Sequence, residues 1–206
     1  MKNQIKKFIL GTILIATTVS GYCAASLVSP LDQFSRKGKP EFYGVAEYLT
    51  AWRTTKFSHD HYLKIDSGFG GGVGFGYNIN DYLNVNSSIT GASLDFETQN
   101  SFFGTTSGDT AFVKWDVSLD YNILKKRLTP LLTAGAGATY FSGNFANQWF
   151  NLGETGVIWG VGGGVRWDIS DHWFAKAIYR ANWNDLQDAD EITRFSSIGL
   201  SIGYTF

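Results

Sequence analysis

The last nine residues, Ile198 to Phe206, alternate large apolar residues with small ones. Successive side chains of a β-strand point to opposite faces, so this stretch predicts a strand with one apolar face and one face of small residues. Such a strand fits either the edge of a soluble sandwich or a membrane barrel whose apolar face meets lipid. Tyr204 and Phe206, an aromatic pair at the very end, favour the membrane barrel.

The amino terminus predicts export from the cytoplasm. Lys2, Lys6 and Lys7 precede an apolar run, and small residues close it, so residues 1–25 are expected to be a cleaved signal peptide. Two alternatives are a lipidated Cys23 and a membrane anchor, although the apolar run is shorter than the about 20 residues that a spanning helix needs. Residues 26–40 are expected to form a periplasmic lead-in, and residues 41–206 the folded domain.

Cleavage would remove the only cysteine and three of the 17 basic residues, while all 18 acidic residues lie beyond the signal. The mature chain would therefore be acidic and free of disulfides. An acidic chain with no basic cluster is not suited to nucleic acid, and we expect no nucleic-acid partner.

Eight segments of the mature chain have strand-like alternation, and no apolar run is long enough for a spanning helix. We therefore expect an all-β fold, an eight-stranded antiparallel up-and-down transmembrane β-barrel. The segments are Glu41–Trp52, Gly68–Ile79, Tyr82–Phe96, Ala111–Ile123, Thr129–Phe141, Thr155–Ile169, Trp173–Trp183 and Phe195–Phe206. In the third segment Leu94 falls out of phase with Leu83, which predicts a β-bulge near Gly91.

The segment Ala111–Ile123 has the most regular pattern, with every charge on one face and Val, Trp, Leu, Tyr and Ile on the other. A soluble barrel would bury the apolar face and expose the charged one, so alternation alone leaves both arrangements open. Aromatic residues toward the strand ends, such as Trp167 and Trp173, favour the membrane arrangement because they match interfacial girdles.

The connections between the segments alternate between short and long. Tight polar turns are expected at residues 80–81, 124–127 and 170–172, and long loops at residues 53–67, 97–110, 142–154 and 184–194. Outer-membrane barrels have short periplasmic turns and long external loops. Both termini are therefore expected in the periplasm.

Several of these motifs resemble one known family, the small bacterial outer-membrane β-barrels of the outer membrane protein A and opacity types. The resemblance rests on residues 76–83, 162–167, 171–173, Tyr179-Arg180 and 199–206. It implies a structural or surface-interaction role, that of an adhesin or antigen, without catalysis. It also implies that Tyr204 and Phe206 form the signal read by the barrel assembly machinery, that outer-membrane lipids surround the barrel, and that external loops contact host or envelope ligands.

The inward faces carry charges of both signs, and we expect them to form a salt-bridge and hydrogen-bond network inside the lumen. The expected members are Glu47, Lys114, Asp116, Asp120, Arg166, Lys176 and Arg180. A barrel of about eight strands is filled by side chains, so a large passive pore is not expected, and a small gated ion or proton path is the alternative. The glycines of residues 68–76 recur mostly every second residue and lack the phosphate-loop ending, so they fit an inward face with room for longer side chains.

His59 and His61 lie two residues apart in the first expected loop, a weak metal-binding pattern without a further ligand nearby. With Ser58 they also suggest a hydroxyl nucleophile and base, the basis for the alternative function of a lipid A-modifying enzyme. The external aromatics Phe102, Phe103, Trp149 and Phe150 are consistent with a contact surface or an interfacial belt. We expect no catalytic residues, no metal and no cofactor.

Overall fold

The computed structural model describes residues 34–51, 55–58, 61–100, 104–144, 151–186 and 193–206. The signal segment predicted for residues 1–25, and most of the lead-in, lie outside the described residues. The barrel belongs to the unit Ser35–Phe206, which forms its own set of contacts. Within the described part, no helix has the length and hydropathy needed to cross a membrane.

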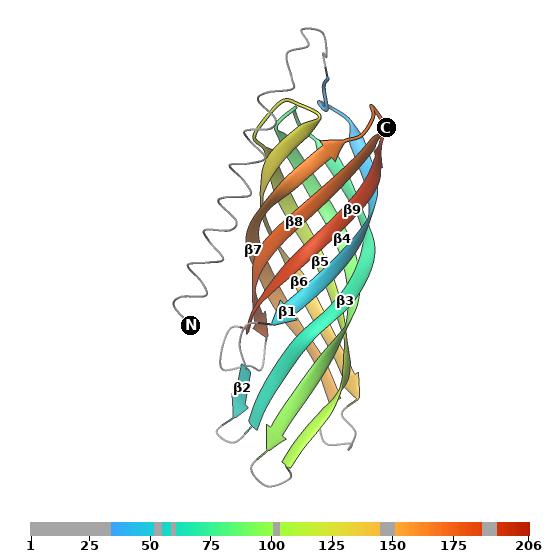
Figure 1. Ribbon diagram of the computed structural model, residues 1–206. Coiled ribbons are helices and arrows are strands. Elements are labelled where there is room, and N and C mark those ends of the chain that lie inside the picture. Colours follow the sequence, from blue (N-terminus) through green and yellow to red (C-terminus); the bar gives the residue numbers. More distant parts are fainter. Residues whose placement is uncertain (1–33, 52–54, 59–60, 101–103, 145–150, 187–192) are drawn as a thin grey trace, which may run out of the picture. The chain divides into compact units, whose positions relative to one another are not determined.

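The described residues form one antiparallel sheet that closes on itself. Its strands are β1 (Pro40–Ala51), β2 (Thr55–Ser58), β3 (His61–Asn78), β4 (Leu83–Asn100), β5 (Gly104–Asn122), β6 (Leu128–Asn144), β7 (Asn151–Asp168), β8 (Trp173–Leu186) and β9 (Thr193–Thr205). Each strand pairs with its sequence neighbour, and β1 pairs with both β9 and β3, so β1 and β3–β9 close the ring (Figure 1). The predicted eight-stranded up-and-down barrel is confirmed, and β2 is a short addition that pairs with β3.

The two faces of the barrel wall differ as the alternation predicts. Along β5, outward Val113, Trp115 and Val117 are exposed, whereas inward Lys114 and Asp116 are buried. A soluble barrel would have the reverse burial. An apolar, exposed outer surface around a charged, buried interior is the arrangement that a lipid-facing barrel needs.

The tight turns fall where they were predicted, within one or two residues, between β3 and β4, between β5 and β6, and between β7 and β8. We call this end of the barrel the turn end, and the opposite end the loop end. An aromatic girdle surrounds the turn end on the outer surface. Its exposed members are Tyr77, Tyr82, Tyr121, Trp167, Trp173 and Phe206.

The strands continue far into the regions predicted to be long loops. β4 runs to Asn100 and β5 begins at Gly104, where a loop over residues 97–110 was expected. With a rise of about 3.3 Å per residue and a tilt of about 40°, an 18-residue strand such as β4 spans about 45 Å along the barrel axis, well beyond an apolar band of about 25 Å. Bilayer thickness limits only the lipid-facing band, because hairpin partners continue to satisfy backbone hydrogen bonds in water. The expected loop boundaries were therefore wrong.

The bulge predicted near Gly91 is also wrong. β4 pairs without a shift along all of β5, and the register shift lies in β3, between Ile65 and Gly68. Leu94 shares the inward parity of Asn84 and Thr90 and is buried in an apolar layer of the lumen, so it is out of phase with Leu83 because the two residues lie on opposite faces of β4.

Candidate functional site: the barrel lumen

The end of the lumen at the turns holds a buried cluster of charges. Arg166 on β7 donates from Nη2 to Glu41 Oε1 at 2.6 Å and from Nη1 to Glu41 Oε2 at 3.1 Å. Its Nε also donates to Asp168 Oδ1 at 3.0 Å. All three side chains are almost fully buried. Because a bidentate arginine satisfies both carboxylate oxygens, this arrangement compensates the burial of charge.

Arg36 joins this cluster from the segment before β1. A turn over Arg36 to Lys39 directs the side chain into the barrel: Lys39 N donates to Arg36 O at 3.1 Å, and Gly38 has the left-handed φ of 74° that glycine adopts most readily. The Arg36 guanidinium donates to Asp168, to the backbone oxygen of Asp81 and to that of Lys126. One buried side chain thus ties β7 to two of the three turns.

Asp81 anchors the same segment from the surface of the first turn. Its carboxylate accepts hydrogen bonds from Ser35 Oγ at 2.7 Å and from Arg36 N at 2.9 Å, and it forms an ion pair with Lys125 at 2.7 Å. Burial by itself would raise the pKa of Asp81, but the hydrogen bonds from Lys125, Ser35 and Arg36 N outweigh burial and hold the pKa at about 2. The hydrogen bond between Lys125 and Asp81 in turn raises the pKa of Lys125.

An aromatic layer lies next along the lumen. The rings of Tyr43 and Phe174 meet edge to face at 6.2 Å. The Arg166 guanidinium lies 4.5 Å above the Phe174 ring, and Lys176 Nζ lies 5.3 Å from the same ring. Lys176 also donates to Asp120 Oδ2 at 3.0 Å. Cations thus pair with carboxylates on one side and with ring faces on the other.

Glycines make room for this layer. A Cβ added at Gly74 would lie 2.2 Å from the Tyr43 ring, and one at Gly203 would lie 2.5 Å from the Phe174 ring. The glycine period in residues 68–76 is therefore structural at this point, since Tyr43 occupies the space above Gly74.

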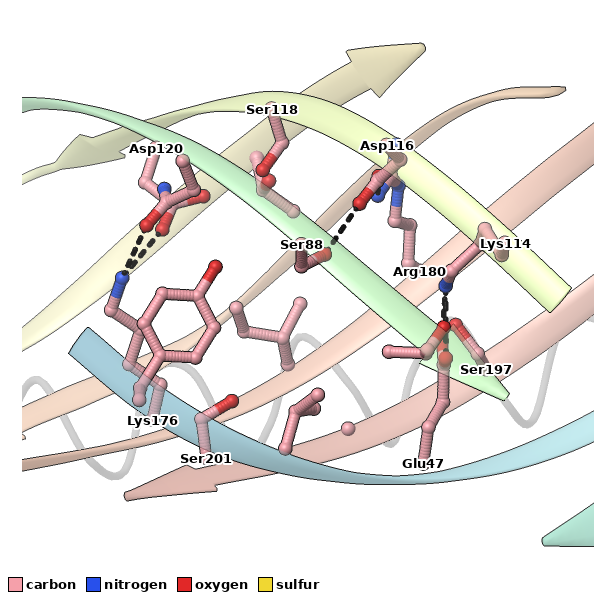
Figure 2. Close-up of a pocket in the computed structure, with 17 residues that line it drawn as sticks. Glu47, Ser88, Lys114, Asp116, Ser118, Asp120, Lys176, Arg180, Ser197 and Ser201 are labelled. Carbon is pink, nitrogen blue, oxygen red and sulfur yellow. Dashed lines mark hydrogen bonds and ion pairs between the residues drawn. The ribbon is translucent and has the colours of Figure 1, made fainter. Parts of the chain in front are cut away.

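The middle of the lumen contains a cavity of about 80 Å³, room for several water molecules. Figure 2 shows its charged residues as pairs: Lys114 donates to both Glu47 oxygens at 2.8 and 2.9 Å, and Arg180 pairs with Asp116, which also accepts from Ser88 Oγ at 2.8 Å. Serine hydroxyls and Thr133 add further polar groups to the lining, which also includes Val45 and Ile178. The cavity can hold water or a small ion.

Toward the loop end, the lumen becomes apolar. The buried inward residues of this layer are Leu49, Leu94, Phe112, Phe141, Ile158 and Phe195. The Phe112 ring lies 4.7 Å from that of Phe141 and 6.1 Å from that of Phe195. This loop-end layer lines the lumen above the charged pairs with side chains that water wets poorly.

All seven charged residues predicted from the sequence face the lumen and are buried. They form the pairs Lys114–Glu47, Lys176–Asp120, Arg180–Asp116 and, with a residue that was not predicted, Arg166–Glu41. The inward parity of Glu41 and Asp168 could have revealed them, because they lie in phase with Glu47 and Arg166. Nothing periodic marks Arg36.

The other candidate residues from the sequence are the two histidines of the first expected loop, the external aromatics and the terminal aromatic pair. His59 lies outside the described residues, and His61 is the first residue of β3. Among the described residues, no group of three or more His, Cys, Asp or Glu could hold a metal ion. Phe102, Phe103, Trp149 and Phe150 lie outside the described residues. At the turn end, the Tyr204 ring stacks on His172 at 5.3 Å and meets Phe206 at 5.1 Å.

An eight-stranded antiparallel barrel with an apolar outer band and a charged, filled lumen defines a class of protein, the small transmembrane β-barrel. A family model places the chain within that class: residues 21–206 match the outer membrane protein beta-barrel domain, and the chain belongs to this family. It is therefore a β-barrel protein of the bacterial outer membrane, surrounded by the lipids of that membrane.

Solved structures with the same fold come from other outer-membrane proteins. OprG from Pseudomonas aeruginosa is 12% identical with a TM-score of 0.60, covering 83% of this chain and 97% of that one. Neisserial surface protein A is 17% identical with a TM-score of 0.57, covering 81% and 97%. The N-terminal barrel domain of Pseudomonas aeruginosa OprF is 16% identical with a TM-score of 0.52, covering 82% and 98%. No curated protein matches the sequence.

Proposed function

We propose that this barrel is a closed, non-catalytic structural protein of the outer membrane that presents its loop end to the outside for surface interactions. The observation that carries the proposal is the filled lumen: a charge cluster at the turn end, three ion pairs around the cavity and the loop-end layer. Among the described residues, these side chains occupy the lumen and leave the cavity of about 80 Å³ between them, as expected for a barrel of eight strands. The strand extensions at the loop end are then the part of the molecule available to partners.

The orientation belongs to the same proposal. Short turns are periplasmic in outer-membrane barrels, and the strand extensions are all at the opposite end. The segment before β1 and the end of β9 would both lie in the periplasm, where Tyr204 and Phe206 would be available to the barrel assembly machinery. A test uses Thr106→Cys in the mature chain, whose signal-free sequence has no other cysteine. A membrane-impermeant maleimide should label this variant on intact cells, and labelling only after lysis would reverse the orientation.

Absence of catalysis is tested directly with the lipid A reaction. The refolded barrel in mixed micelles with lipid A and a phospholipid donor should leave the masses of both lipids unchanged. Gain or loss of one acyl chain, abolished by His59→Ala or His61→Ala, would establish the enzyme instead.

A small gated ion path is the second candidate, because the cavity is polar and lined by ion pairs that could exchange partners. Planar-bilayer recording separates the two candidates. The closed barrel should give no conductance steps in molar salt, whereas a gated path should give steps that change when Lys114→Met or Asp116→Asn removes one member of a pair.

A further inference from the structure

The turn between β5 and β6 carries three consecutive cations, Lys125, Lys126 and Arg127. Two of them pair with the neighbouring turns: Lys125 Nζ lies 2.7 Å from Asp81 Oδ2, and Arg127 Nη2 lies 2.7 Å from Asp171 Oδ1. The side chains of Lys125 and Arg127 nevertheless remain accessible, with exposed fractions of 48% and 35%. We call these three residues the basic turn.

The surface of the turn end is positively charged as a whole. The leading segment contributes an exposed Lys37 and a half-exposed Lys39, in addition to the basic turn. Among the described residues of this end that lie outside the lumen, five cations face the carboxylate side chains of Asp81 and Asp171. A surface with this excess of positive charge favours an anionic partner.

Exposed aromatic rings flank the basic turn on the outer surface. The rings of Tyr82 and Tyr121 are stacked, with centroids 6.4 Å apart, and Tyr82 directly follows the Asp81 that pairs with Lys125. On the other side, β6 begins opposite Trp167, which is also exposed. Tyr and Trp rings of membrane proteins lie at the level of the lipid headgroups. The basic turn is therefore placed where long cationic side chains reach headgroup phosphates.

A strip of small side chains leads from the basic turn along the outer face of β6. Its exposed members are Ala134, Ala136 and Ala138, and we call them the alanine strip. Ala138 pairs with Trp115 on β5, and Ala136 pairs with Trp159 on β7. Because a methyl group projects much less than an indole, the strip lies lower than the exposed side chains on both sides. It extends about 13 Å along the strand, close to the roughly 15 Å of one leaflet of a hydrocarbon core about 30 Å thick.

The charge of the basic turn decides between two occupants of the alanine strip. A second copy would be related by a two-fold axis along the membrane normal, so the basic turns of both copies would meet at the same height and repel each other. An anionic lipid has no such conflict, because its phosphate and its chain match the turn and the strip in the same order.

We propose that the basic turn and the alanine strip bind one anionic phospholipid. Its phosphate contacts Lys125, Lys126 and Arg127, and one acyl chain lies on the strip. This inference rests on the proposed orientation, because short turns in the periplasm place the site in the inner leaflet, which consists of phospholipids.

Native mass spectrometry of the refolded barrel in detergent tests the binding. Phosphatidylglycerol and phosphatidylcholine with the same acyl chains are added in equal amounts. The barrel should retain one phosphatidylglycerol with an affinity about tenfold or more above that for phosphatidylcholine. Equal retention of the two lipids would overturn the proposal. So would a preference for lipid A over phosphatidylglycerol, since it would assign the cations to the lipid of the outer leaflet.

Paired charge variants locate the headgroup. The double variant Lys125→Gln with Lys126→Gln should lose most of the preference for phosphatidylglycerol, about tenfold in affinity. Lys37→Gln with Lys39→Gln removes the same charge from the leading segment, away from the alanine strip, and should keep most of the preference. Equal losses would show that the charge of the whole end, and no defined site, attracts the lipid.

A second pair of variants locates the acyl chain. Ala136→Phe fills the alanine strip and should lower phosphatidylglycerol affinity about fivefold or more. Ala177→Phe, at an exposed outward alanine of β8, is the control and should bind as wild type does. Both variants should still shift in mobility between boiled and unboiled gel samples, which shows that they fold. Normal binding by folded Ala136→Phe would contradict the proposal. Because detergent exposes both ends of the barrel, the lipid result is independent of the cell-labelling result that tests orientation.

Discussion

Arg36 and Asp168 are joined by two hydrogen bonds across 132 residues of sequence, from Nε at 2.9 Å and from Nη2 at 2.6 Å. The first residue precedes the barrel and the second ends β7. Because Arg36 also donates to Asp81 O and Lys126 O, it fastens the leading segment beneath the turn end of the lumen.

Arg36→Ala should lower the free energy of unfolding by about 2–4 kcal/mol, because backbone oxygens of two turns and part of the Asp168 carboxylate lose a charged donor. Arg166 still donates to Asp168, which limits the loss. Urea unfolding in lipid vesicles, followed by tryptophan fluorescence, measures it. Lys37→Ala, an exposed neighbour, is the control and should stay within about 0.5 kcal/mol of wild type. Equal effects of the two changes on the free energy of unfolding would show that the hydrogen bonds of Arg36 do not stabilise the barrel.

Asp81 should make stability depend on pH in the acid range. Its pKa falls from 3.8 to about 2 on folding, so its contribution is fully present above pH 3.8 and is lost as pH falls toward about 2. Asp81→Asn should therefore destabilise the barrel by about 1 kcal/mol at neutral pH, a value reduced by solvent screening, and this difference should disappear by about pH 2. Parallel unfolding curves between pH 7 and 2 provide the check, and a constant difference would contradict it.

Lys114 and Glu47 should show strong energetic coupling, because removing either side chain leaves the charge of the other buried without its partner in this ion pair. Lys114→Met or Glu47→Gln alone should cost about 3–5 kcal/mol, and the double variant should cost less than the sum. A double-mutant cycle from urea unfolding gives the coupling energy. Additive losses would mean that the two side chains act independently.

Val117→Arg should cost about 2–4 kcal/mol, because Val117 faces outward midway along the part of β5 that pairs with β6, and the charge would enter the lipid. Ile123→Arg is the matched control at the turn end, where the expected cost falls to about 0–1 kcal/mol. Equal costs at the two positions would place the lipid band elsewhere on the barrel.

Gly74→Ala should destabilise the barrel by about 1–3 kcal/mol, because the new methyl would lie 2.2 Å from the Tyr43 ring and force it to move. Gly44→Ala, in β1, should have little effect, because a methyl group added at Gly44 would meet no other atom within 4 Å. Thermal or urea unfolding compares the stabilities of the two variants. If Gly74→Ala is as stable as wild type, the aromatic layer can move to accommodate the methyl group.

Much of the fold could be predicted from the sequence because strand periodicity is local. Alternation within Ala111–Ile123 distinguishes the faces of β5 without reference to any other strand. Together with the polar turn residues and the aromatic residues near the strand ends, this alternation predicted the eight barrel strands, the three turns and the inward placement of residues such as Lys114, Arg166 and Arg180. Their charges also implied partners, since an isolated charge inside a narrow lumen is unfavourable.

Only the tertiary structure decided which partners meet. The stagger between strands in the closed ring brings Lys114 to Glu47 and Arg180 to Asp116, and that stagger is a property of the whole sheet rather than of any one strand. Arg36 lies in no periodic segment, so its place beneath the lumen depends on the turn at Gly38 and on a carboxylate 132 residues away. The end of the β5–β6 ladder at Ala111 and Ser142 likewise depends on the whole sheet, and alternation along a single strand does not encode it.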